Sequence, residues 1–115
     1  MYKNLVLYRN ELKNKTIPKY KLIGIVTELI YSKKIFKRNK DIKTFVNDIF
    51  DIELKDYILK SRTMIVAKIS KEIVYSENTN LYKSALNNFI NNQINIIKKE
   101  GNIKDKKNEF DGWLK

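Results

Sequence analysis

Residues that break regular structure are scarce in this sequence. Its 115 residues include three glycines and one proline, and no segment gathers them. Because glycine and proline most often end helices and form turns, a chain so poor in them favours helices joined by short connections. Apolar residues recur along most of the chain at spacings of three and four, as in amphipathic helices. The sequence therefore predicts an all-α fold, a compact bundle of four or five helices in a single domain.

Two of the expected helices have clear starting signals. Pro18 is tolerated in a first helical turn, because the N–H that proline lacks has no partner there. It opens a helix over about 18–36. Asn39 is a favoured N-cap residue, and Asp41 would place an anion in the first turn of a helix over 39–50. The two apolar stripes are Leu22, Ile25, Val26, Leu29, Ile30 and Phe36, then Ile42, Phe45, Val46, Ile49 and Phe50.

Two further helices follow. One is expected over 54–75, with an interruption near 61–63 as an alternative. The other begins near Tyr82 and is expected to stop at Gly101, since glycine is the commonest residue just past a helix end. Their stripes are Leu54, Ile58, Ile65, Ile69 and Ile73, then Tyr82, Leu86, Phe89, Ile90, Ile94 and Ile97.

The two ends of the chain are less regular. Residues 1–14 suit a helix, but the apolar run from Leu5 to Tyr8 also suits a short buried strand, and both alternatives stay open. Residues 102–115 are charged up to an aromatic end, Phe110–Leu114. We therefore expect a helical domain over 1–101, followed by a short mobile tail over 102–115 whose aromatic end docks weakly.

The residue types of most enzyme sites are missing. The chain has no histidine and no cysteine, which removes the usual general base, thiol nucleophile and zinc ligands. The glycines are isolated, so no phosphate-binding loop is expected. The four acids over 48–56 fit no metal-binding loop, and we expect them to be solvated. The sequence predicts a protein that is not an enzyme and has no metal or cofactor.

A net charge of +11 is the main functional clue. It favours a polyanionic partner. However, the 21 Lys, 17 Ile and 14 Asn share AT-rich codons, so codon usage in an AT-rich bacterium or one of its mobile elements offers an equal explanation. The sequence contains no run of about 18 apolar residues, so it predicts no membrane span. It also shows no apolar core of a signal peptide. We expect a cytoplasmic protein.

The cations are densest between two expected helices. Six lie within eleven residues, with only Asp41 against them: Lys33, Lys34, Lys37, Arg38, Lys40 and Lys43. They can form a corner that contacts phosphates, with an affinity that falls steeply with salt. They can equally form a solvated loop, and both interpretations stay open.

The expected helices over 39–50 and 54–75, joined by a turn of about three residues, resemble the outline of a helix-turn-helix. If the second helix is continuous, its outer face gathers Tyr57, Lys60, Met64, Lys68 and Lys71. A basic face with an aromatic residue suits phosphate contacts and one groove contact. Two features weaken the resemblance to a helix-turn-helix: any amphipathic helix exposes lysines, and the turn lacks the usual glycine.

Arg62 falls on the apolar side of that expected helix. A buried guanidinium needs a carboxylate or several carbonyls as partners, and Glu28, Asp48 or Asp51 could serve. A local break at 61–63 could instead turn it outward. We expect a structural role for Arg62 rather than a phosphate contact.

These features predict a non-enzymatic accessory or regulatory protein that binds DNA or RNA. Its sites would be the corner over 33–43 and the face with Tyr57, Lys60, Lys68 and Lys71. A homodimer is expected if a helix-turn-helix is used. The alternative is a protein-interaction module, such as an inhibitor, an immunity-type protein or a small helical subunit, whose charge reflects codon usage.

Overall fold

The computed structural model describes residues 2–113, with side chains for residues 2–100. Within this range its regular secondary structure is all helical, with no strand, which confirms the predicted all-α class. The six helices there are α1 (Tyr2–Leu12), α2 (Lys19–Tyr31), α3 (Asn39–Phe50), α4 (Asp56–Leu59), α5 (Arg62–Tyr75) and α6 (Asn80–Trp113). The described range thus has one helix more than the four or five predicted, because the helix expected over 54–75 is divided into the single turn α4 and the helix α5.

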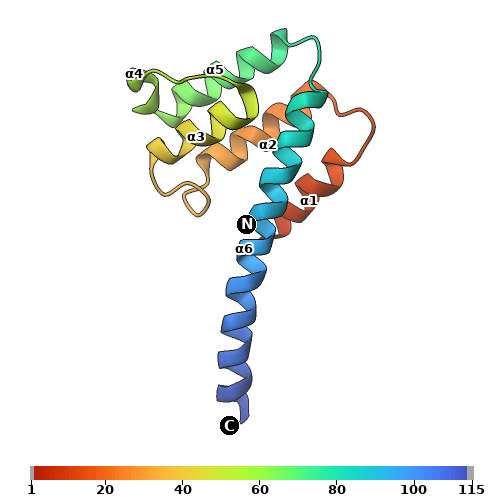
Figure 1. The fold of residues 1–115 in the computed structure, drawn as a ribbon, viewed down its shortest axis with the longest axis vertical. Helices are drawn as coiled ribbons and strands as arrows, with labels where there is room; N and C mark the ends of the chain where they lie inside the picture. The colour runs from red at the N-terminus through yellow and green to blue at the C-terminus, as the bar shows by residue number, and fades with distance from the viewer. Residues whose placement is uncertain (1, 114–115) are drawn as a thin grey trace.

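The helices pack in pairs around one core. Helix α1 lies against α6 and α2 lies against α5, while α3 contacts α4, α5 and α6. Figure 1 shows the connection between α2 and α3, the helix α4 and the start of α5 together at one end of the body. The connection between α1 and α2 lies at the opposite end. The second half of α6 extends away from the other helices.

The core consists of the predicted apolar stripes. Every stripe residue from Leu22 to Ile73 is buried, and Leu86, Ile90 and Ile94 are buried on α6. Each such side chain contributes about 1.5–3 kcal/mol of transfer free energy on burial. No polar or charged side chain is buried among the residues whose burial is described. Hydrophobic burial therefore sets the arrangement of the helices, and charged groups remain at the surface.

The N-terminal segment is a helix, which decides between the two alternatives left open by the sequence. Leu5 and Leu12 of α1 are buried, and Tyr8 between them is partly buried. All three face the same side at spacings of three and four, so the run from Leu5 to Tyr8 belongs to an amphipathic helix and not to a strand.

Helix α2 is shorter than predicted, because it ends at Tyr31 and not near Phe36. Ser32 has an extended backbone (φ −75°, ψ 113°), and a turn over residues 33–35 follows. The carbonyls of Ile30 and Ser32 bind the side chain of Arg62. A contact distant in sequence thus satisfies helix-end carbonyls that a longer α2 would have satisfied with its own N–H groups.

The predicted continuous helix over 54–75 was wrong, and the predicted interruption near Ser61 is confirmed. Helix α4 ends at Leu59, and Ser61 is the N-cap of α5, where its side chain accepts a hydrogen bond from the Met64 N–H at 3.3 Å. Helix α3 ends at Phe50, and its C-cap residue Asp51 adopts the left-handed conformation (φ 55°). Residues 51–61 therefore separate α3 from α5, and the predicted three-residue turn of a helix-turn-helix is absent.

Helix α6 continues through Gly101 to Trp113, so the prediction that Gly101 ends it was wrong. Glycine inside a helix costs only about 1 kcal/mol relative to alanine, which the helix on either side can tolerate. Two predictions lie outside the residues whose side chains are described: the docking of the aromatic end, Phe110–Leu114, and the mobility of residues 102–115.

Candidate functional site

One side chain, Arg62, joins the α2–α3 connection to the start of α5. Its Nη1 donates to the Ile30 carbonyl at 2.7 Å, and its guanidinium also donates to the carbonyls of Ser32 and Phe36. Its Nε donates to Oδ1 of Asn39 at 3.0 Å. The partners are therefore carbonyls and an amide, and not the acids considered from the sequence. A guanidinium forks over several acceptors at once, which fixes the path of the connection.

Two further contacts strengthen the same junction. Nδ2 of Asn39 donates to the Leu59 carbonyl at 2.8 Å, and the Tyr31 hydroxyl donates to Oγ1 of Thr63 at 3.1 Å. The N-cap role predicted for Asn39 was wrong, since Arg38 occupies that position. Asn39 instead uses its amide to hold the end of α4 against the start of α3.

These contacts bring the backbone next to Lys60 to the start of α3. Lys60 follows Leu59, whose carbonyl binds Asn39, and Lys40 follows Asn39. Apart from Lys43, the predicted site cations of this region are exposed. We call the following group the basic end: Lys33, Lys34, Lys37, Arg38, Lys40 and Lys60.

The remaining predicted site residues lie elsewhere. Lys43 is only partly exposed and lines a different hollow, which it shares with Glu53. Lys68 and Lys71 share an exposed face of α5 with Met64, at helical spacing. Tyr57 is 57% exposed on α4. Because α4 and α5 are separate helices, Tyr57 and Lys60 do not lie on one continuous helix with Lys68 and Lys71.

The basic end has no neutralising acids at salt-bridge distance. Among the described side chains, the one ion pair within 4.0 Å joins Lys21 and Glu11, at 3.1 Å between α2 and α1. Asp41 is the acid closest in sequence, and its Oδ2 accepts a hydrogen bond from the Arg38 backbone N–H at 3.2 Å. The ammonium and guanidinium groups of the basic end are thus available to an external anion.

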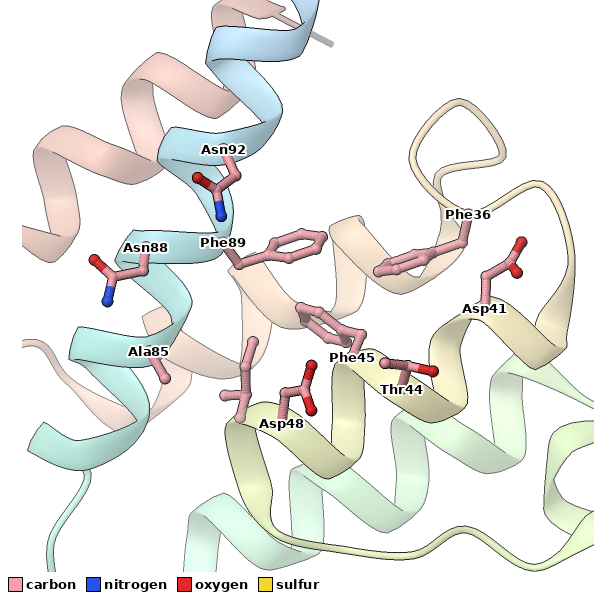
Figure 2. A pocket seen from close by; sticks show the side chains of 10 residues that line it. Phe36, Asp41, Thr44, Phe45, Asp48, Ala85, Asn88, Phe89 and Asn92 are labelled. Carbon is pink, nitrogen blue, oxygen red and sulfur yellow. The ribbon is translucent and has the colours of Figure 1, made fainter.

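A cleft lies between α3 and α6, and its lining includes Phe36 and Asp41, which flank Lys37, Arg38 and Lys40 in sequence. Figure 2 shows three phenylalanine rings in it, contributed by the α2–α3 connection, α3 and α6. Phe36 and Phe89 are stacked with centroids 5.8 Å apart, and Phe45 meets Phe89 edge-on at 4.6 Å. The lining also includes two carboxylates and two amides, from Asp41, Asp48, Asn88 and Asn92. The cleft has a volume of about 380 Å³.

Sequence reasoning missed this cleft. Phe36, Phe45 and Phe89 fit the apolar stripes, so their spacing gave no reason to separate them from the core. Asn92 was explained by AT-rich codon usage. The density of aromatic rings on facing stripes could have drawn attention to the site, but only the packing of α3 against α6 shows that they meet.

Two classes of site are not found in the described part of the chain. It contains no group of three or more acidic, histidine or cysteine side chains that could hold a metal ion. None of the helices searched there combines the length and the apolar character needed to cross a membrane.

No family model, no curated protein and no solved structure matches this chain significantly.

Proposed function

We propose that the protein binds nucleic acid through the basic end, as a non-enzymatic accessory or regulatory protein. The observation that carries the proposal is the gathering of six exposed cations, from two separate segments, on one end of the body. The contacts of Arg62 and Asn39 hold those segments together. Cations spaced along one surface match a phosphate backbone, and their binding releases counterions from it.

Codon usage explains the number of lysines but not their arrangement. A surplus that followed composition alone would be expected to spread evenly over the surface. The densest group is instead joined by a sixth cation, Lys60, through a contact between residues twenty positions apart in sequence. The arginine that fixes the loop makes no ion pair of its own among the described side chains. The fold thus concentrates charge where neutralising it would require an external partner.

The test is a titration of fluorescently labelled single-stranded and duplex oligonucleotides. We expect dissociation constants in the micromolar range at physiological salt, as for binding through phosphates alone. In the variant with Lys37→Glu, Arg38→Glu and Lys40→Glu, we expect binding to weaken by more than tenfold. All three side chains are exposed, so the helical content should not change.

A charge-matched control separates position from net charge. The variant with Lys13→Glu, Lys15→Glu and Lys98→Glu changes exposed residues away from the basic end by the same total charge. It should bind within about threefold of the unchanged protein, because exposed charges farther apart than the Debye length of about 8 Å are largely screened. Equal losses in the two variants would contradict the proposal. Absence of binding by the unchanged protein would favour the protein-interaction alternative.

A further inference from the structure

The cleft between α3 and α6 combines three kinds of group that one class of ligand can satisfy together. Its inner surface is aromatic, its rim carries hydrogen-bond acceptors and amides, and the basic end lies beside it. Phe36 and Asp41 of the cleft are interleaved in sequence with Lys37, Arg38 and Lys40. A ligand placed here meets a ring, polar edge groups and cations within one short stretch.

The accessible ring is that of Phe89. Phe36 and Phe45 are each only 4% exposed, whereas Phe89, which contacts both, is partly exposed. In Figure 2 the Phe89 ring extends from α6 towards Phe36, and the Asn92 amide lies next to it, whereas Asn88 points away. A flat ligand would contact Phe89 and leave the two buried rings as support behind it.

The polar groups at the rim favour a ligand with N–H donors. Asp48 is exposed and has no ion-pair partner among the described side chains, so its carboxylate can accept hydrogen bonds. The exposed Asn92 amide can both donate and accept. In nucleic-acid recognition, Asp accepts from the exocyclic amino group of cytosine, and Asn forms paired bonds with adenine.

We infer that this cleft receives one unpaired base of a single-stranded nucleic acid whose phosphates lie on the basic end. The inference rests on the proposed function and makes it more specific. An unpaired base offers an apolar face for Phe89, an amino group for Asp48 and a phosphate for the neighbouring cations. Unstacked bases in single strands are commonly recognised by this combination of stacking and edge contacts.

A basic peptide is less well suited to the same cleft. Its cation would satisfy Asp48, but it would have to approach a protein of net charge +11 beside Lys37, Arg38 and Lys40. A nucleotide carries the opposite charge at the end where these cations lie. The arrangement of charges therefore favours the single strand.

The first experiment compares oligonucleotides that have the same phosphates but different bases. Fluorescence anisotropy would measure the binding of a single-stranded oligo-dC, an oligo-dT and an abasic strand of equal length. Oligo-dC should bind about tenfold more tightly than the abasic strand, since stacking of one base typically contributes this much. Oligo-dT should bind less tightly than oligo-dC, because thymine lacks the amino group. A duplex of equal length should bind more weakly than oligo-dC.

The second experiment uses a substitution for which attraction by charge and recognition of the base predict different results. Asp48→Asn removes a negative charge, so simple attraction of phosphates should strengthen all binding. Recognition of the base by Asp48 predicts instead that the preference for oligo-dC over oligo-dT disappears. Phe89→Leu should reduce the advantage of oligo-dC over the abasic strand while it keeps an apolar side chain in the core. Circular dichroism would check that both variants fold.

The outcomes separate this inference from the proposed function. Equal binding of oligo-dC and the abasic strand, or a preference for oligo-dC that survives Asp48→Asn, would overturn the base site and leave phosphate binding intact. Equal binding of duplex and single strand would overturn it too. Binding of none of the strands would overturn both proposals. If Asp48→Asn weakens only the binding of an arginine-containing peptide, the cleft is a protein site and the inference is wrong.

Discussion

The guanidinium of Arg62 binds four oxygen atoms that belong to the end of α2, the α2–α3 connection and the start of α3. No other side chain in the described part joins so many segments through hydrogen bonds. The side chain is only partly buried, so water can replace some of these bonds when it is removed. Its role is to fix the geometry of the loop that carries most of the basic end.

Replacing Arg62 by alanine should lower the free energy of unfolding by about 2–3 kcal/mol, because carbonyls in partly buried positions lose a charged donor. Arg62→Lys should restore part of this loss, since an ammonium group cannot fork over the same acceptors. Urea denaturation followed by circular dichroism measures both. Arg38→Ala is the matched control, because the guanidinium of the exposed Arg38 donates no hydrogen bond in the described structure. Its free energy of unfolding should stay within about 0.5 kcal/mol of that of the unchanged protein. Equal losses at the two arginines would contradict the assigned role.

Gly24 lies in the interior of α2, exposed, and a Cβ atom added there would meet no atom within 4 Å. Gly24→Ala should therefore raise the free energy of unfolding by about 0.5–1 kcal/mol, because alanine restricts the unfolded chain and favours the helix. Thermal denaturation would show this as a higher midpoint. Ala67→Gly, at an exposed interior position of α5, should cause a loss of similar size. Destabilisation by Gly24→Ala would contradict the expectation that a methyl group fits at this position of α2 without a clash.

At the scale of the elements, the division of the region after α3 into α4 and α5 decides where the cations lie. Ser61 causes the division, because its side chain caps the Met64 N–H and starts α5. Ser61→Ala should cost about 1 kcal/mol, the usual contribution of such a cap. Ser61→Asp should retain the stability, since aspartate caps equally well. Ser70→Ala within α5 serves as the control and should have almost no effect. An unchanged urea midpoint in Ser61→Ala would contradict the capping role.

Most helices could be predicted from the sequence because their apolar spacing and starting signals agree. The segment from Asn39 to Phe50 has the apolar spacing and the first-turn acid Asp41, and α3 has the predicted bounds, although its N-cap is Arg38 and not Asn39. The end of α2 could not be predicted, since it depends on the contact of Arg62 with Ile30 and Ser32, which are 32 and 30 residues away in sequence. The passage of α6 through Gly101 depends on the helix around it, and glycine alone gives only a weak stop signal.

The candidate site shows the same difference between local and distant information. The sequence indicated the dense run of cations from Lys33 to Lys43, because these residues are close along the chain. It placed Lys60 with Lys68 and Lys71, since a helical wheel assumes one continuous helix. The hydrogen bond from Nδ2 of Asn39 to the Leu59 carbonyl instead connects the segment before Lys60 to this run. The cleft beside it depends on the pairing of α3 with α6, which no local pattern contains.

At the scale of the whole molecule, the question is whether binding follows the total charge or the position of the charge. The logarithm of a binding constant falls linearly with the logarithm of salt concentration, by about 0.7 per phosphate neutralised on a single strand. If all six cations of the basic end contact phosphates, the slope should be about −4. This value depends on the number of contacts and not on the net charge of +11.

The slope therefore tests the proposal independently of the affinity at any one salt concentration. The variant with Lys37→Glu, Arg38→Glu and Lys40→Glu should have a slope smaller in magnitude by about 2, because three phosphate contacts are lost. The control variant with Lys13→Glu, Lys15→Glu and Lys98→Glu should keep the slope of the unchanged protein, since its substitutions remove no contact. Anisotropy titrations between about 50 and 200 mM salt would measure all three. A slope that decreased equally in both variants would show that phosphates bind all over the surface, and the ordered junction around Arg62 would then have no part in the recognition.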